Sequence, residues 1–266
     1  MTSDSLFLNF AREVAREHRL LIAEISAQSL EIDQKKDSSL VTNIDRALEE
    51  HFRNRVSERF PTHGVIGEEQ GATKQSAEFR WVIDPIDGTE ELACGLSLYG
   101  SIIALYENNT CVVALIDHPA LDVCYYAMRG HSTYRNDVPV KLQNTALSEL
   151  PRFGIASRSN FLRTGDEGNV FEGLTKRFPN VRAFHSCYAH TAAVDGGLDV
   201  MVEWNVNFWD IAATRLLVEE AGGKYHPLPM RETREKGSLY SAVFGKPKFV
   251  GEAVEYLQSV GFSSLP

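Results

Sequence analysis

The sequence WVIDPIDGT, residues 81–89, places two carboxylates directly after a hydrophobic run. Residues 81–83 favour β structure, and Pro85 has no amide hydrogen to donate to a neighbouring strand, so the pattern predicts a buried strand that ends at Pro85. Asp84 and Asp87 would then leave the edge of a sheet together. Two carboxylates about 4 Å apart repel by roughly 1 kcal/mol in water and about 4 kcal/mol at a protein surface, so we expect a cation between them.

The two residues that follow favour an anion site beside that cation. Gly88 lets the backbone approach a bound group closely, and the amides of Gly88 and Thr89 can face an anion if a turn or helix begins there. This interpretation puts metal on one side of the stretch and phosphate on the other. A purely structural alternative is equally strong for the motif alone, because Asp-Pro and Asp-Gly are common turn dipeptides.

Composition limits the function classes. The chain of 266 residues is 43% hydrophobic and carries 27 basic against 36 acidic residues, a formal net charge of −9. This balance argues against a broad nucleic-acid surface and against binding to anionic membranes. No apolar run approaches the ~20 residues of a membrane span, and no signal-peptide core is evident, so we expect a cytoplasmic protein. The four cysteines form no C-x-x-C pair, which excludes zinc-ribbon and thioredoxin-like chemistry.

Hydrophobic periodicity predicts alternating helices and strands, and therefore sheets covered by helices. We expect one unit with two sub-halves, a metal-binding α+β half at residues 1–140 and a substrate-side α/β half at residues 141–266. Residues 35–39 are expected to form a loop, and residues 90–98 a loop or short helix. The predicted helices span residues 6–29, 187–194, 207–221 and 248–260; a further helix follows residues 40–45 and reaches about residue 60, and another lies within residues 161–178. The predicted strands span residues 81–83, 101–106, 111–117, 123–128, 153–156, 181–184, 198–203 and 241–244, and a short apolar strand precedes Glu68.

Acidic residues in three other segments also occur in sequence patterns that have an ordinary structural explanation. Glu68 and Glu69 follow a short apolar strand in a glycine-flanked loop, where neighbouring acids are usually only solvated. Thr42 and Asp45 resemble a helix capping box, which explains both residues without a site. Asp210 comes three residues after Asn207, a suitable N-cap, and a carboxylate in a first helical turn is favoured by up to about 1 kcal/mol. On the functional interpretation, Asp210 is a rigidly held metal ligand.

Other phosphate chemistries lack their motifs. The sequence contains no G-x-x-x-x-G-K-[ST] loop and no G-x-G-x-x-G unit. An aspartyl nucleophile of the D-x-D-x-T type would need an acid two residues before Asp87, where Pro85 stands. Neither G-x-S-x-G nor a Ser-His-Asp arrangement is evident. Direct attack by water activated on metal remains, because the candidate site is rich in carboxylates and poor in nucleophiles.

These motifs, in this order, resemble the inositol monophosphatase family of Mg²⁺-dependent, lithium-sensitive phosphatases. The resemblance rests on GEE at residues 67–69, DPIDGT at residues 84–89, Trp209-Asp210 and VEEAGG at residues 218–223. The stretches at residues 35–45, 80–89 and 117–134 are most similar to the histidinol-phosphatase-like branch. The resemblance implies a layered α-β-α-β-α sandwich, a small phosphorylated metabolite as substrate, and usually a homodimer.

The resemblance also implies roles for particular residues. Two or three Mg²⁺ ions would be held by Glu68, Asp84, the Ile86 carbonyl, Asp87 and Asp210. Thr89 with Glu68 would orient the attacking water, which makes Glu68, Asp87 and Thr89 the catalytic candidates. The Gly88 and Thr89 amides would hold phosphate, and Glu203 and Ser186 would contact the rest of the substrate. Asp45, Thr42 and Glu69 would lie at a further, weaker metal position or behind the ligands.

The specificity half departs from the family pattern. Residues 90–97 differ from the usual continuation of the GT motif, and Ser186 replaces an aspartate typical of histidinol-phosphate enzymes, which weakens the case for an ammonium-bearing substrate. Histidinol phosphate and inositol monophosphate are the leading substrates. Sugar bisphosphates and 3′-phosphoadenosine 5′-phosphate are the alternatives. A regulatory, partner-binding protein that retains the fold is the alternative of another class, and a set of caps and turns without any site is the third.

Overall fold

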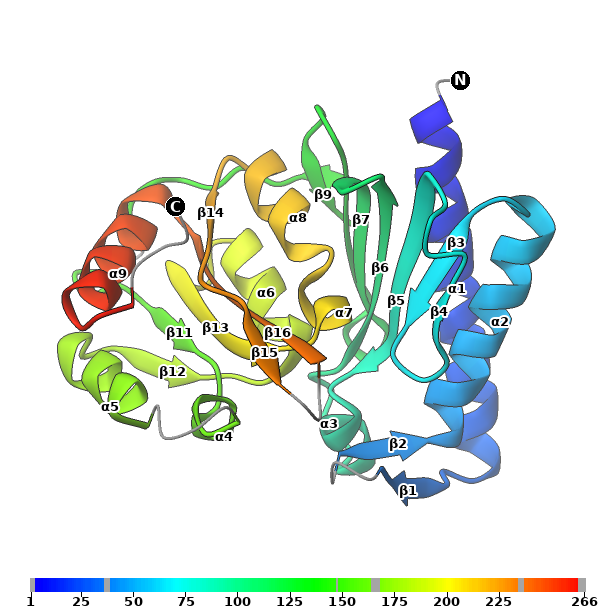
Figure 1. Cartoon of the computed structure of the whole chain (residues 1–266), viewed down its shortest axis with the longest axis horizontal. Coiled ribbons are helices and arrows are strands. Elements are labelled where there is room, and N and C mark those ends of the chain that lie inside the picture. The colour runs from blue at the N-terminus through cyan, green and yellow to red at the C-terminus, as the bar shows by residue number, and fades with distance from the viewer. Residues whose placement is uncertain (1–2, 36–38, 147, 164–167, 234–236, 263–266) are drawn as a thin grey trace.

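Two β-sheets alternate with layers of helices in the computed structural model, which describes residues 3–35, 39–146, 148–163, 168–233 and 237–262. Helices α1 and α2 cover the outer face of the larger sheet, α6 to α8 lie between the two sheets, and α9 packs on the outer face of the smaller sheet (Figure 1). The predicted α-β-α-β-α sandwich is confirmed. Among the described helices, none has the length and apolar character that a membrane-spanning segment requires.

The first helical layer packs through aromatic side chains. Phe7 and Phe10 of α1 (Ser3–Gln28) and Phe52 of α2 (Asn43–Arg59) surround the fully buried Trp81 of the larger sheet. Such aromatic contacts add about 0.5–1.5 kcal/mol per pair beyond area burial. The predicted capping box at the start of α2 is present, which fixes where this helix begins. The acidic strand is thus anchored from behind by the first two helices.

The larger sheet has the strand order β10-β9-β8-β7-β6-β5-β3-β4. Strands β5 to β9 form an antiparallel meander, and β3 joins β5 in parallel. A separate hairpin of β1 (Ile32–Gln34) and β2 (Leu40–Thr42) precedes α2; of the predicted loop at residues 35–39, residues 36–38 lie outside the described residues. The strands of the larger sheet are β3 (Gly64–Gly67), β4 (Gly71–Thr73), β5 (Phe79–Asp87), β6 (Gly100–Glu107), β7 (Thr110–His118), β8 (Val123–Met128), β9 (Thr133–Arg135) and β10 (Val138–Pro139).

The prediction that Pro85 ends its strand is wrong. Strand β5 continues to Asp87, and its pairing with β6 shifts register between Asp84 and Asp87. A proline without an amide hydrogen is tolerated at such an irregularity, where no ladder bond is required of it. The Pro85 carbonyl accepts a hydrogen bond from the Ser101 hydroxyl instead. The irregularity therefore holds both aspartates within one strand.

The smaller sheet comes from the second part of the chain, with the order β12-β11-β13-β16-β14 and with β15 paired to β16. Its strands are β11 (Phe153–Ile155), β12 (Val181–Ala183), β13 (Val200–Val206), β14 (Lys224–Pro227), β15 (Arg231–Thr233) and β16 (Gly237–Gly245). The remaining helices are α3 (Thr89–Ala93), η1 (Pro119–Leu121), α4 (Arg158–Phe161), α5 (Gly168–Arg177), α6 (Ser186–Val194), α7 (Phe208–Ile211), α8 (Thr214–Glu220) and α9 (Pro247–Ser259).

Two predicted helices are divided. The helix expected at residues 207–221 forms α7 and α8, which are separated by two alanines whose backbone stays near helical values while the Tyr106 hydroxyl donates to the Ala212 carbonyl. The helix expected at residues 161–178 forms α4 and α5, and residues 164–167 of that prediction lie outside the described residues. The sequence pattern also missed the short strands β1, β2, β4, β9, β10, β14 and β15.

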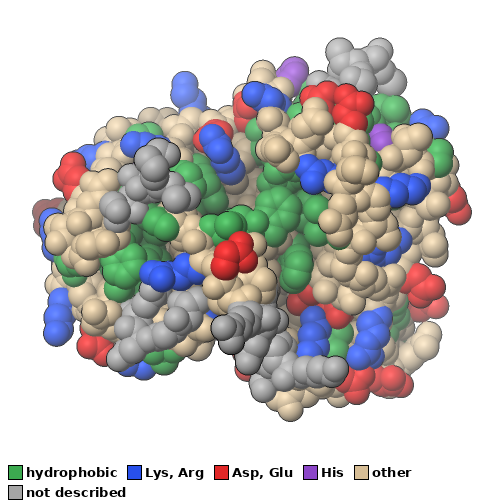
Figure 2. All heavy atoms as spheres, viewed as in Figure 1, with side chains coloured by type: hydrophobic (Ala, Val, Ile, Leu, Met, Phe, Trp, Pro, Cys, Tyr) green, Lys and Arg blue, Asp and Glu red, His purple; other side chains and the backbone are tan. Residues whose placement is uncertain are grey.

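The face of the molecule drawn in Figure 2 carries charges of both signs. Lys and Arg side chains are scattered among acidic ones, and hydrophobic side chains gather where the two sheets approach each other. Among the described residues on this face, the basic side chains form no continuous surface.

Candidate active site

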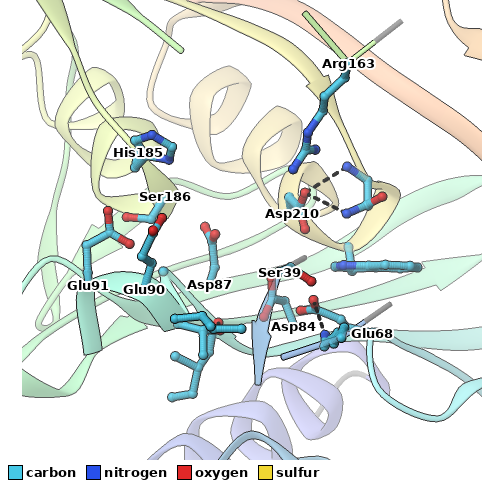
Figure 3. A pocket seen from close by; sticks show the side chains of 17 residues that line it. Ser39, Glu68, Asp84, Asp87, Glu90, Glu91, Arg163, His185, Ser186 and Asp210 are labelled. Carbon is cyan, nitrogen blue, oxygen red and sulfur yellow. Dashed lines mark hydrogen bonds and ion pairs between the residues drawn. The ribbon is translucent and has the colours of Figure 1, made fainter. Parts of the chain in front are cut away.

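A cavity of about 620 Å³ opens where segments from both sheets meet. Glu68 follows β3, Asp84 and Asp87 belong to β5, and Asp210 belongs to α7, and their carboxyl groups face this common space (Figure 3). The structure thus brings together acids that are widely separated along the chain. The predicted residues that line the cavity are Glu68, Asp84, Ile86, Asp87, Gly88, Thr89, Ser186 and Asp210.

The two aspartates of β5 differ in burial, because Asp84 is buried and Asp87 is half-buried. Asp84 is 1% exposed, and its Oδ1 atom has no hydrogen-bond partner. Asp87 accepts a hydrogen bond from the Cys187 backbone amide at the start of α6. Burial raises the pKa of both carboxyls well above the usual range, and the negative charges of Glu68 for Asp84 and of Asp210 for Asp87 raise it further. The site therefore disfavours its own ionised state unless a cation is present.

The turn that carries Glu68 and Glu69 is held by a buried acid of α2. Glu49 accepts hydrogen bonds from the backbone amides of Glu69 at 2.7 Å and of Gln70 at 3.0 Å. Gly67 must pass close to this carboxylate, because a Cβ atom at Gly67 would overlap Glu49. Burial raises the pKa of Glu68 and of Glu69 to about 7. Glu69 does not line the cavity.

Lys35 compensates part of this negative charge. Its Nζ atom lies 2.8 Å from Glu68 Oε1 and 2.6 Å from Glu69 Oε1, and it also lines the cavity. The ammonium group lowers the pKa of both glutamates, in opposition to burial. The hairpin of β1 and β2 thus supplies a cation to the acidic edge of the larger sheet.

Asp210 is held at the start of α7 by a capping box. Its Oδ2 atom accepts a hydrogen bond from the Asn207 backbone amide at 2.8 Å. Burial raises the pKa of Asp210 to about 6, although the Asn207 hydrogen bond and the nearby Arg163 charge lower it. Arg163 also donates to the Asn205 carbonyl at 3.0 Å and points toward Asp210 (Figure 3). Capping leaves the Asp210 side chain at the cavity, so the capping role does not exclude the predicted role as a metal ligand.

Asp45 and Thr42, which were predicted to lie at a further metal position or behind the ligands, are joined to Thr89 by hydrogen bonds. Asp45 accepts from the Thr42 backbone amide at 2.9 Å and from the Thr42 hydroxyl, while its Oδ1 atom accepts from the Thr89 hydroxyl at 3.0 Å. The Thr89 hydroxyl also lies 3.0 Å from the Ile86 carbonyl oxygen. Burial raises the pKa of Asp45, and these hydrogen bonds oppose the shift. Asp45 and Thr42 thus orient Thr89 rather than line the cavity.

The two predicted substrate residues lie on the side of the smaller sheet. Ser186 adopts a left-handed backbone conformation, with φ of 66°, and its hydroxyl donates to the Leu98 carbonyl at 2.6 Å. Glu203 does not line the main cavity but an adjoining one of about 360 Å³. The two cavities share several wall residues, among them Asp87, Ser186 and Asp210. An extended ligand could therefore occupy both.

Comparison with known proteins agrees with this geometry. The sequence profile of the inositol monophosphatase family matches residues 4–249. The chain belongs to this family. It is 33% identical over 229 residues to a histidinol-phosphatase of Mycobacterium tuberculosis, with 84% of this chain and 87% of the relative covered. It is 32% identical over 230 residues to an inositol-1-monophosphatase of Bacillus subtilis, with 85% and 86% covered.

Solved structures of the inositol monophosphatase family share the fold. The extragenic suppressor protein suhB of Bartonella henselae superposes with a TM-score of 0.81 at 22% identity, covering 95% of this chain and 98% of that one. Family membership places the chain among phosphoric monoester hydrolases that act on small phosphorylated metabolites. It also places it among proteins that generally depend on metal.

The donor set of this family member suits a hard divalent cation. Every predicted ligand presents oxygen, the preference of Mg²⁺, and the unpartnered, buried Asp84 Oδ1 atom has capacity for one. Among the described residues, no three His, Cys, Asp or Glu side chains are close enough to enclose an ion as they stand. Binding therefore requires the carboxyl groups to turn toward the ion.

Sequence reasoning missed the ionisable side chains that line one or both cavities beside the predicted acids: Lys35, Glu90, Glu91, Arg163, His185 and His190. Lys35 lies in a segment with an ordinary polar loop composition, Arg163 lies in the turn after α4, and His190 lies in α6 without a motif around it. The paired lysines at residues 35–36, close to an acidic site, were the only available signal. Their contributions depend on tertiary placement.

Proposed function

We propose that the protein is a Mg²⁺-dependent phosphomonoesterase in which water, and not a side chain, attacks the phosphate. One observation carries the proposal. Buried or partly buried carboxyl groups from three separate segments surround one cavity, and one of their oxygen atoms, Asp84 Oδ1, is buried without a hydrogen-bond partner. So many mutually repelling acids are unfavourable in a protein interior unless they bind a cation.

The ligands proposed for Mg²⁺ are Glu68, Asp84, the Ile86 carbonyl, Asp87 and Asp210. When bound, Mg²⁺ lowers the pKa of coordinated water and neutralises charge on the phosphate oxygens. The protein contributes rigid placement of the ligands, because Asp87 is fixed by the Cys187 amide and Asp210 by its capping box. We propose two or three ions per site.

Thr89 and Glu68 are proposed to orient the attacking water. The single hydroxyl hydrogen of Thr89 is directed toward Asp45 and the Ile86 carbonyl, so the lone pairs of Thr89 Oγ1 remain to accept a hydrogen from water. The Glu68 carboxylate can accept another. Asp45 thereby determines which way the Thr89 hydroxyl points, which gives the capping box of α2 a role in the reaction.

The phosphate is proposed to lie against the Gly88 and Thr89 amides. Gly88 has φ of 94°, and a Cβ atom there would lie 3.1 Å from the Ser186 Cβ atom, so a side chain at this position would narrow the cavity. The alcohol part of the ester then extends past Ser186 toward Glu203. Histidinol phosphate and inositol monophosphate, which the names of the two relatives point to, are the leading candidates.

Phosphate release from a panel of small phosphate esters, with Mg²⁺ and with excess chelator, tests the proposal. The panel comprises histidinol phosphate, inositol 1-phosphate, a sugar bisphosphate, 3′-phosphoadenosine 5′-phosphate and phenyl phosphate. We expect hydrolysis that depends on Mg²⁺, and the ratio of kcat/KM values ranks the substrates. Absence of phosphate release from every ester in the presence of Mg²⁺ would refute the proposal and favour a partner-binding role.

We further propose a cytoplasmic homodimer. The mass in solution, measured by sedimentation or light scattering, tests the dimer, and cell fractionation tests the location. A monomer at micromolar concentration would contradict the proposed dimer and would leave the proposed location and activity untouched.

A further inference from the structure

Glu203 lines the second cavity, and both of its carboxylate oxygen atoms accept hydrogen bonds. It is 5% exposed and belongs to β13. Its Oε1 atom accepts from the Trp204 backbone amide at 3.1 Å, and its Oε2 atom lies 2.8 Å from His190 Nε2. Because a carboxylate can only accept, His190 Nε2 carries the hydrogen of this bond.

The His190 ring is itself fixed on its other sides. Its Nδ1 atom lies 2.9 Å from the Thr214 hydroxyl oxygen, and the Phe244 ring meets it nearly edge-on, with centroids 5.2 Å apart. His190 is 2% exposed and Thr214 is fully buried. With both nitrogens bonded and one face packed, the imidazole has one orientation available.

This pair lies next to the proposed phosphate site. Glu203 and His190 line the same cavity as Asp87 and Asp210. The negative charge of Glu203 is close enough to raise the pKa of both aspartates. A carboxylate offers about four lone-pair directions, and two are used by Trp204 and His190. The remaining capacity faces the cavity into which the alcohol part of an ester would extend.

We propose that His190, fixed by Thr214, is a positioning residue that holds Glu203 in one rotamer, so that Glu203 accepts a hydrogen bond from the alcohol part of the substrate. The inference rests on the proposed function and adds a determinant of specificity to it. The group that Glu203 recognises is a hydrogen-bond donor close to the ester, either a hydroxyl or an ammonium group.

A purely structural role for the pair makes a different prediction. A buried His–Glu contact that serves only stability would, when broken, affect turnover of all esters to the same extent. A positioning role affects only esters that have a donor for Glu203. The two roles are therefore separated by an ester without any donor, such as phenyl phosphate.

The experiment compares the wild-type protein with His190→Ala, His190→Gln and Thr214→Val, in Mg²⁺, on inositol 1-phosphate, histidinol phosphate and phenyl phosphate. We expect His190→Ala to lower kcat/KM about 10- to 100-fold on whichever donor-bearing ester is a substrate, and less than about 3-fold on phenyl phosphate. His190→Gln keeps an N–H donor toward Glu203 and should restore most of the loss. Thr214→Val should give an intermediate loss with the same selectivity.

The results separate a failure of the proposed function from a failure of the positioning role of His190. If the wild-type protein hydrolyses none of the esters, the proposed function fails and this inference with it. If the wild-type protein is active but His190→Ala changes all esters equally, or changes none, only the positioning role is overturned. Should His190→Ala fail to fold, as judged by its thermal unfolding, the pair of His190→Gln and Thr214→Val decides by the same selectivity. Loss on histidinol phosphate alone identifies the recognised donor as ammonium, and loss on inositol 1-phosphate alone identifies it as hydroxyl.

Discussion

Asp87 connects the two sheets at the scale of a single side chain. It belongs to β5 of the larger sheet, yet it accepts a hydrogen bond from the first turn of α6, 100 residues further along the chain. Its burial and the neighbouring Asp210 charge raise its pKa well above the usual range. A group that is unfavourable in its ionised form is maintained here because, on the proposed mechanism, that form binds the cation.

We expect Asp87→Asn to reduce kcat by about 10²-fold or more, because an amide cannot replace a charged ligand. Its thermal unfolding midpoint should be unchanged or higher in the absence of metal, since the neutral side chain no longer repels Asp210. Asp122→Asn is the matched control: Asp122 does not line the cavity, its exposed side chain pairs only with Arg19 among the described ion pairs, and its left-handed backbone conformation suits asparagine. Full activity of Asp87→Asn would remove this residue from the mechanism.

The acids of the site could be predicted because each stands in a short motif of unusual composition, as Asp84 and Asp87 do. The basic residues could not. Lys35 reaches Glu68 from a hairpin that precedes it by a whole helix, and His190 meets Glu203 by the packing of α6 on β13. Contacts of this kind depend on the order of elements in the fold, which local residue patterns do not contain.

At the scale of elements, the turn after β3 depends on the close approach of Gly67 to Glu49. We expect Gly67→Ala to destabilise the protein by about 1–3 kcal/mol, because the new Cβ displaces a carboxylate that accepts hydrogen bonds from two backbone amides of the turn. Activity should fall as well, since Glu68 leaves the same turn.

Gly251→Ala in α9 is the control with the opposite sign. A Cβ atom at Gly251 meets open space within a regular helix, so alanine should stabilise by about 0.5–1 kcal/mol. Chemical denaturation of both variants measures the two effects. A Gly67→Ala protein as stable as the wild type would show that the Glu49 carboxylate can move away from the new Cβ atom without lowering the free energy of unfolding.

Element boundaries were predicted well where helices are long and amphipathic, as in α1. The prediction failed at Pro85, because a strand irregularity lets a proline remain inside a sheet. It failed at residues 207–221 because the pair of alanines between α7 and α8 looks like good helix. Short strands such as β15 carry too few residues to show an alternating pattern.

At the scale of the whole molecule, the excess of buried acid links metal, pH and stability. Glu68 and Glu69 have pKa values raised to about 7, so the stability associated with their protonated forms is present at low pH and is lost as pH rises through 7. Burial lowers the pKa of His18 to about 3, so His18 changes stability in the opposite direction. A comparison with a variant is therefore needed to isolate the two glutamates.

We expect the double variant Glu68→Gln/Glu69→Gln to be more stable than the wild type at pH 8 in chelator, and equal to it near pH 4.5. Mg²⁺ should stabilise the wild type more at pH 8 than at pH 5.5, because the glutamates are ionised at the higher pH. At a concentration of 100 times the Kd, each bound site raises the free energy of unfolding by about 2.7 kcal/mol. Thermal unfolding across pH measures both effects, with Glu255→Gln on α9 as the control. An equal Mg²⁺ effect on the wild type and the double variant would argue against binding at Glu68.

The layered architecture could be predicted from the alternation of helix and strand together with the ordered motifs. The strand orders could not. That β3 lies beside β5, and that β13 lies between β11 and β16, follows from how the layers pack against each other.

The division of the site among distant segments also has a consequence for biosynthesis. Asp84 and Asp87 leave the ribosome early, but the amide that fixes Asp87 comes from α6 and the last acid comes from α7. On the proposed mechanism, a nascent chain that already contains the complete larger sheet is catalytically silent. Premature termination before Asp210 would release a fragment with a cluster of acids and no turnover.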